Sequence, residues 1–311
     1  MGNRPCIIGS RSSKLALAQA QLIRDKLKAF YPALDTEIKT IKTTGDKILD
    51  VALSKIGDKG LFTKEIEEAL SRGEIDLAVH SMKDLPTQLP QDLKIAAVTE
   101  REDACDALVS RQGFTLKTLP KGSKVGTSSL RRRSQLLHMR DDLDVLDLRG
   151  NLDTRIKKLE QGSYDAIILA HAGIKRLGLE LKLSVIPLEE MLPQAGQGAL
   201  GIEIRENDRE MGDLVKALDD PDLHLSIDAE RALLSGLEGG CQVPIGVYAH
   251  VRDGRISIKA GVFSLDGKVA VRDEIMGSKK DAKDLGRQLA ERILKDKAAR
   301  QILDDVRKAG I

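Results

Sequence analysis

The sequence predicts an α/β fold with mainly parallel sheets over its first two thirds, followed by a C-terminal α+β domain with a three-stranded antiparallel sheet. Short β-branched runs alternate with amphipathic stretches through the first two thirds, which is typical of βα units. Near the C-terminus, Asp253-Gly254 and Asp266-Gly267 separate alternating segments in the manner of tight hairpin turns. A length of 311 residues fits two or three domains at roughly 150 residues each.

The elements expected in the first two thirds follow from apolar spacing and from helix caps. Helices are placed where apolar residues recur every three or four positions after a Ser or Thr, and Gly73 marks the end of one of them. Residues 8–13 and 125–131 share a strand, a glycine, a hydroxyl cluster and a helix start, which indicates two related domains. The expected elements are a strand at 7–8, a helix over 15–27, a strand at 36–40, a helix from 63 to about 71, strands at 76–80, 106–109 and 124–127, a helix over 128–137, and strands at 145–148 and 166–169.

The C-terminal part changes character after Asp219-Asp220-Pro221, where we place a domain boundary. The two Asp-Gly turns predict a three-stranded antiparallel meander. Helical patterns from about Lys280 to Lys295 and from Ala298 to Lys308 follow it. These segments together predict the small α+β domain.

Composition excludes several classes of protein. Lys and Arg total 50 against 48 acidic residues, so the net charge of +2 provides no general field for nucleic acid or an anionic membrane. Three Tyr, four Phe and no Trp leave few base-stacking platforms. No apolar stretch reaches the roughly 18 residues of a bilayer span. The three cysteines include no CxxC pair, so we expect a cytoplasmic protein without a metal site.

Two glycine-hydroxyl-helix junctions, at 9–13 and 126–129, resemble anion cradles, because free N–H groups and the helix dipole favour a carboxylate or a phosphate. Hydroxyls at helix starts are also ordinary N-caps. Arginines beside both junctions favour the anion interpretation, since a guanidinium group binds a carboxylate as a two-pronged fork. A row of arginines at strand ends therefore predicts a ligand with several carboxylates. The arginines are Arg11, Arg131, Arg132, Arg133, Arg149 and Arg155.

The segment 79–86 ends a strand with polar residues where a buried strand would continue with apolar ones. Asp84 is either a turn former or a carboxylate that faces the arginines, gives a proton to a leaving group and stabilises a cationic intermediate. Lys83 and Lys55 are its candidate partners. His80 lies on the other register of the strand and is expected to be structural.

The loop 238–244 places Cys241 between two glycines and a proline. On such a bend a thiol can react or carry a covalent group. Cys6 and Cys105 instead fit the usual role of free cysteines as small buried apolar residues.

Nucleotide binding is disfavoured. Residues 196–201 have the glycine spacing of a dinucleotide fingerprint but no preceding strand, and Pro193 argues for a loop. The phosphate-binding pattern GxxxxGK[ST] does not occur in the sequence.

Along essentially its whole length the chain resembles the porphobilinogen deaminase family, also called hydroxymethylbilane synthases. The family joins four porphobilinogen molecules head to tail, with release of ammonia, into the linear tetrapyrrole hydroxymethylbilane of heme biosynthesis. The resemblance therefore implies a transferase with a dipyrromethane cofactor, held through a thioether to Cys241. The matching blocks are 8–16, 57–65, 78–86, 125–132, 148–155, 194–201 and 239–244.

The resemblance also implies roles for individual residues. Asp84 would contact pyrrole N–H groups, support the azafulvene cation formed on deamination and assist proton transfer. Each pyrrole carries an acetate and a propionate, which accounts for the many arginines. Cofactor contacts would come from Cys241, Lys83, Asp84, Ser81, Thr127, Ser128, Ser129, Arg131, Arg132 and Arg149, and substrate contacts from Arg11, Ser13, Gln19, Arg149, Arg155, Arg176 and Gln197.

The fold implied by the resemblance has two domains like those of periplasmic binding proteins, with a crevice between them. Residues 1–99 with 194–217 would form the first domain, 100–193 the second, and 218–311 a third that carries the cofactor loop. The family tends to be monomeric. His171 and Asp141-Asp142 depart from the usual family residues, but they lie outside the matched functional blocks, so no change of activity is expected.

Two other functions are alternatives. An anion-binding receptor with the same two-domain cleft would need neither Cys241 nor Asp84. A DNA-binding regulator using Arg131, Arg132 and Arg133 is disfavoured by the near-neutral charge and by the lack of a helix-turn-helix pattern.

Overall fold

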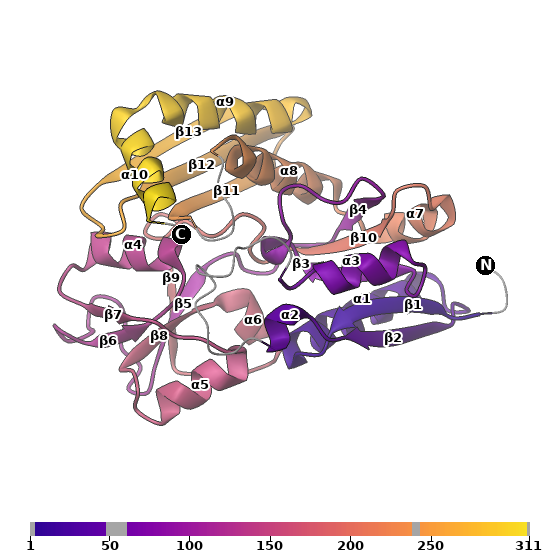
Figure 1. The fold of residues 1–311 in the computed structure, drawn as a ribbon, viewed down its shortest axis with the longest axis horizontal. Helices are drawn as coiled ribbons and strands as arrows, with labels where there is room; N and C mark the ends of the chain where they lie inside the picture. The colour runs from indigo at the N-terminus through magenta and orange to yellow at the C-terminus, as the bar shows by residue number, and fades with distance from the viewer. Residues whose placement is uncertain (1–3, 48–60, 238–242, 310–311) are drawn as a thin grey trace.

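The computed structural model describes residues 4–47, 61–237 and 243–309, which are organised around three sheets (Figure 1). In the first sheet β1 is parallel to β2 and β3, whereas β10 is antiparallel to both β3 and β4. All strands except β10 therefore share one direction. The sheet has the order β2-β1-β3-β10-β4, with β1 at Cys6–Arg11, β2 at Thr36–Ile41, β3 at Leu77–Ser81, β10 at Leu200–Arg205 and β4 at Leu93–Val98.

The second sheet repeats this arrangement. Strand β6 is parallel to β7 and β8, and β5 is the reversed strand between β8 and β9. The expected mainly parallel α/β fold is confirmed, and the shared layout explains the sequence similarity between residues 8–13 and 125–131. The order is β7-β6-β8-β5-β9, with β5 at Asp106–Ser110, β6 at Lys124–Gly126, β7 at Asp144–Leu146, β8 at Ala166–Ala170 and β9 at Leu183–Ile186.

Helices pack against both sheets, and the starts of α1 and α4 coincide with hydroxyl residues singled out in the sequence. Ser13 caps α1 by accepting a hydrogen bond from Ala16 N at 3.3 Å, and Ser129 caps α4 in the same way with Arg132 N at 3.4 Å. The helices are α1 (Lys14–Phe30), α2 (Thr44–Lys47), α3 (Lys64–Ser71), α4 (Leu130–Met139), α5 (Leu152–Glu160), α6 (His171–Arg176) and α7 (Arg209–Val215).

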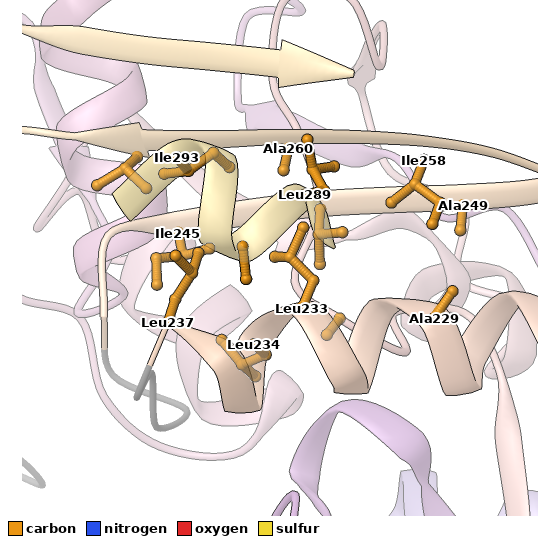
Figure 2. Packing of buried hydrophobic residues seen from close by; sticks show 14 of the residues in the cluster. Ala229, Leu233, Leu234, Leu237, Ile245, Ala249, Ile258, Ala260, Leu289 and Ile293 are labelled. Carbon is orange, nitrogen blue, oxygen red and sulfur yellow. The ribbon is translucent and has the colours of Figure 1, made fainter. Parts of the chain in front are cut away.

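The C-terminal unit is the expected three-stranded antiparallel meander, covered by helices. Its strands are β11 (Ile245–Arg252), β12 (Arg255–Phe263) and β13 (Ala270–Ser278), and its helices are α8 (Pro221–Gly236), α9 (Ala282–Lys295) and α10 (Lys297–Lys308). Figure 2 shows Leu233 of α8 and Leu237, the residue after the helix, packed with Ile245, Ile258 and Leu289 in the core between the helices and the sheet.

The first Asp-Gly turn is as tight as predicted, because Asp253 and Gly254 have φ of 52° and 75° and alone join β11 to β12. The second Asp-Gly pair also lies in a tight turn, which Gly267 N closes by donating to Ser264 O at 2.9 Å, but the whole connection between β12 and β13 is longer than two residues and runs over 264–269. Asp266 accepts hydrogen bonds from Ser264 Oγ at 2.6 Å and Lys268 N at 3.1 Å, so its side chain organises a longer loop.

Two crossing segments, 99–105 and 187–199, join the first two sheets, and they are tied together. Glu102 N donates to Gly198 O at 3.0 Å, and Arg101 Nε donates to Gln197 O at 2.8 Å. The fully buried carboxylate of Glu230 in α8 accepts from Arg101, Gly196 N and Ala249 N at 2.7–2.8 Å. This one carboxylate therefore fastens the C-terminal unit to both crossing segments.

Among the described residues, no helix is long and apolar enough to cross a membrane.

Glu230→Gln is expected to lower the free energy of unfolding by about 3 kcal/mol, because it leaves the nearly buried Arg101 guanidinium without its counter-charge. Urea denaturation followed by circular dichroism measures the loss. The matched control is Glu291→Gln on the exposed side of α9, expected to change stability by less than about 0.5 kcal/mol. Equal stability of the two variants would contradict the role given to Glu230.

Candidate active site

Asp84 lies on a short 3₁₀ turn, Met82–Asp84, that directly follows β3. The buried side chains of Met82 and Leu85 anchor the turn on both sides, and Leu85 N closes it by donating to Met82 O at 3.3 Å. The anchors hold the backbone while the side chain of Asp84 stays exposed. The turn therefore presents a carboxylate to solvent from a fixed point at the end of a central strand.

Cationic side chains from both sheet units are electrostatically coupled to this carboxylate or to one another. Burial lowers the pKa of Lys83 to about 8, with Asp84 acting against the shift and Arg132 adding to it. Burial also lowers the pKa of Arg155 to about 10, with contributions from Arg132 and Arg149 and an opposing one from Asp84. These couplings place Lys83, Arg132, Arg149 and Arg155 in one electrostatic network that includes Asp84.

A second carboxylate, Asp106 at the start of β5, organises the arginines of α4. It is completely buried, and it accepts from Arg131 Nη2 at 2.7 Å and from Arg132 Nη2 and Nε at 2.7 and 3.0 Å. Burial alone would raise the pKa of Asp106, but the two guanidinium groups lower it to about 2. Asp106 is therefore an ionised anchor for both arginines.

Arg131 makes more hydrogen bonds within the protein than the sequence prediction assumed. Besides Asp106, it donates from Nη1 to Leu192 O at 2.6 Å. Among the described residues, its buried Nε has no hydrogen-bond partner. The side chain therefore joins α4 to the crossing segment.

Arg149 and Arg155 come from the loop and helix that follow β7. Gly150 between them has φ of 113°, a left-handed conformation that favours glycine. Arg155 Nε donates to Gly150 O at 2.8 Å, which holds the guanidinium back against its own loop. Both side chains are half-buried, so they line the region around Asp84 rather than extend into solvent.

The first sheet contributes a polar pair and a cation beside an aromatic ring. Gln19 of α1 and Ser81 at the end of β3 exchange hydrogen bonds at 2.9 and 3.2 Å, which places both beside the Asp84 turn. The Arg11 guanidinium lies 4.2 Å from the centroid of the Phe62 ring. The sequence analysis did not identify Phe62 as part of this region.

The hydroxyls at the start of α4 make local hydrogen bonds. Ser128 Oγ donates to Leu148 O at 3.1 Å and accepts from Leu148 N at 3.0 Å, while Thr127 Oγ1 accepts from Ser129 N at 3.2 Å. Ser128 thereby fixes the loop that leads to Arg149. These contacts make Ser128 a support of the loop, and the cofactor contact that the resemblance implies for it stays a prediction.

Gln197 and Arg176 lie at the crossing segments. Gln197 Nε2 donates to Ala104 O at 2.7 Å and to Asp106 Oδ1 at 3.0 Å, and its buried Oε1 has no partner in the structure. Arg176 Nη2 donates to Gly198 O at 2.6 Å. Both side chains therefore brace the crossing segments.

Cys241 lies outside the described residues. Cys6 is buried, as expected for a structural cysteine, and Cys105 is half-buried. Burial raises the pKa of each thiol to about 12, so both are protonated and unreactive near neutral pH. His80 is confirmed as structural, since it is buried and its Nε2 lies 3.0 Å from Glu203 Oε2.

The residues present fit a dipyrromethane group. Such a group carries several carboxylates, and the donor set around Asp84 consists of Lys83, Arg132, Arg149 and Arg155, with the unpartnered Arg131 Nε nearby on α4. Within the described part of the chain, no three His, Cys, Asp or Glu side chains gather in a way that could hold a metal ion.

Sequence reasoning missed Asp106, although a signal was present. An aspartate at the head of the apolar run Asp106–Ser110 is costly to bury unless a cation pairs with it. The adjacent Arg131 and Arg132 were available as partners. Considering the strand and the arginines together would have paired Arg131 and Arg132 with Asp106 rather than with a ligand.

Comparison with known proteins indicates one family. Residues 6–213 match the family model "Porphobilinogen deaminase, dipyromethane cofactor binding domain", and residues 224–295 match "Porphobilinogen deaminase, C-terminal domain". Porphobilinogen deaminase from Chloroherpeton thalassium is 50% identical over 306 residues, which cover 97% of each chain. The enzyme of that name from Carboxydothermus hydrogenoformans is 50% identical over 303 residues, again 97% of each chain.

Among solved structures, the second substrate binding domain of a putative amino acid ABC transporter from Streptococcus pneumoniae is 14% identical, with a TM-score of 0.43 over 69% of this chain and 92% of that one. The matches of the two family models and the identity to the curated relatives extend over nearly the whole sequence. The chain belongs to the porphobilinogen deaminase family.

Proposed function

We propose that the chain joins four porphobilinogen molecules head to tail into hydroxymethylbilane, as a transferase of tetrapyrrole biosynthesis. Family membership and the dipyrromethane domain model support this activity. Each condensation forms one C–C bond between pyrroles and releases the aminomethyl nitrogen as ammonia. Nothing in the comparisons supports the alternative of an anion receptor without catalysis.

The observation that carries the proposal is one exposed carboxylate, Asp84, within a group of four cations from two sheet units. The excess positive charge suits a ligand that gains carboxylates with each added pyrrole. The single carboxylate suits the steps in which positive charge develops on the pyrrole being joined. A binding site for a simple anion would have no use for an acid at this position.

We assign the work of the site to this chain's own residues as follows. Lys83, Arg132, Arg149 and Arg155 bind the carboxylates of the cofactor and the growing chain, with Arg11 on the side of the first sheet. Asp84 accepts hydrogen bonds from pyrrole N–H groups and moves the proton that leaves with ammonia. Supporting positions are held by Ser13, Gln19, Ser81, Thr127, Ser128, Ser129, Arg131, Arg176 and Gln197.

The dipyrromethane cofactor, when bound, supplies the pyrrole end that is extended. We propose Cys241 as its attachment point, on the sequence block 239–244. We also propose that residues 1–99 with 194–217, 100–193 and 218–311 are three domains. The placement of β10 in the first sheet and the packing of α8 against the three-stranded C-terminal sheet support this division.

We further propose that the protein acts as a cytoplasmic monomer that does not bind nucleic acid. The near-neutral net charge supports the last point. The large apolar side chains exposed on the described part of the chain are spread over α1, β9 and the hairpin of β12 and β13, which supports a monomer. They are Leu22, Phe30, Val185, Val269 and Met276.

Asp84→Asn is expected to fold normally and to consume porphobilinogen about 10²- to 10⁴-fold more slowly than the wild type, because the amide can neither carry the negative charge nor exchange the proton. The assay follows porphobilinogen loss and ammonia release. Asp141→Asn, an exposed aspartate of the second sheet unit, is the matched control and should keep full activity. Turnover of Asp84→Asn within a factor of two of the control would remove Asp84 from the mechanism.

Lys83 is expected to lose its charge as the pH rises through about 8, because burial lowers its pKa from the usual value near 10.4. Its amine should therefore acetylate with a half-maximal rate near pH 8 in Cys241→Ser, a chain without the tethered anion. Peptide mass spectrometry measures the labelling, with the exposed Lys117 as a reference. A midpoint near pH 10 would show that the Lys83 amine is not desolvated.

A further inference from the structure

One arginine of the C-terminal unit reaches across to the backbone that directly follows Asp84. Arg231 of α8 donates from Nη2 to Pro86 O at 2.6 Å and to Thr87 O at 3.2 Å, and from Nη1 to Leu85 O at 3.4 Å. The guanidinium thus spans three successive carbonyl groups. None of the motifs found in the sequence includes Arg231.

The same face of α8 covers the turn with apolar side chains. Leu223 and Ile227 precede Arg231 by eight and four positions, so the three lie on one stripe of the helix. Leu223 and Ile227 belong to the buried cluster that contains Met82 and Leu85, the two anchors of the Asp84 turn. The turn is therefore held by apolar contact on one side and by the guanidinium on the other.

We infer that Arg231 is a positioning residue for Asp84, an inference that rests on the proposed function. The carbonyls of residues 85–87 lie outside strands and helices, so no ladder of backbone hydrogen bonds fixes them. A planar guanidinium group that binds three of these carbonyl groups restricts the direction in which the side chain of Asp84 points. Displacement of a catalytic group by about 1 Å can cost a factor of about 100 in rate.

The position of Arg231 also links the acid to the C-terminal unit. Arg231 follows Glu230, which fastens α8 to the crossing segments. Further along the chain the same helix ends at Gly236, ahead of the segment that contains Cys241. Arg231 therefore connects two parts of the molecule: helix α8, which precedes the proposed cofactor attachment, and the turn that carries Asp84.

The surroundings of Arg231 make a direct test practicable. Together with Thr87, Ile95, Lys283 and Arg287, it lines an open groove of about 720 Å³ between the first sheet unit and α9. A small guanidinium compound can enter this groove and occupy the place of a removed side chain. Rescue by such a compound distinguishes a positioning role from a general contribution to folding.

The experiment compares holoenzymes of the wild type, Arg231→Ala, Arg231→Lys and the control Arg287→Gln, whose native arginine pairs with Asp284 on the exposed face of α9. For Arg231→Ala we expect kcat to fall about 10- to 100-fold, with KM and the covalent adduct mass unchanged. Methylguanidinium should restore kcat several-fold, and Arg231→Lys should retain an intermediate rate. The control should match the wild type.

Wild-type kcat in Arg231→Ala would overturn the inference. A loss of kcat that neither methylguanidinium nor the lysine variant relieves would also overturn it, since a purely structural residue behaves in that way. Failure of the wild type to consume porphobilinogen would instead overturn the proposed function, and the comparison between variants keeps the two results apart.

Discussion

The structure depends on one buried ion cluster, in which the Asp106 carboxylate binds the guanidinium groups of Arg131 and Arg132. A carboxylate this deeply buried is stable only when cations and hydrogen-bond donors surround it. Gln197 from the second crossing segment supplies a further donor. Through these contacts the start of β5, helix α4 and both connections between the first two sheets are fixed together.

This arrangement gives two carboxylates opposite tasks. Asp106 is enclosed and ionised, and it serves only to hold cations in place. Asp84 is exposed on a turn that the C-terminal unit clamps through α8, so it is free to meet a ligand. Burial lowers the pKa of both Lys83 and Arg155, so these two cations are partly desolvated. Carboxylates of a ligand would restore the charge balance that burial has disturbed.

Much of the fold and part of the site could be predicted from local patterns. Apolar periodicity and hydroxyl caps predicted most of the strands and helices, and the arginines after strand ends indicated an anion site. A strand at 106–109 was predicted, but the reversed directions of β5 and β10 could not be found in this way, because pairing between distant segments leaves no local pattern. The partners of Ser128 and Gln197 were missed for the same reason, since each hydrogen bond joins residues far apart in the chain. Residue 241 lies outside the described residues, so its proposed role rests on the sequence block alone.

The most direct test of this account is the intact mass of Asp106→Asn purified from cells that make porphobilinogen. We expect the wild type to carry a covalent adduct of two pyrrole units and the variant to carry little or none. In the variant no carboxylate holds Arg131 and Arg132 in place. Glu203→Gln, which breaks the buried pair with His80 in the first sheet, controls for lost stability and should keep the adduct. A full adduct on folded Asp106→Asn would contradict the claim that this carboxylate organises the cationic site.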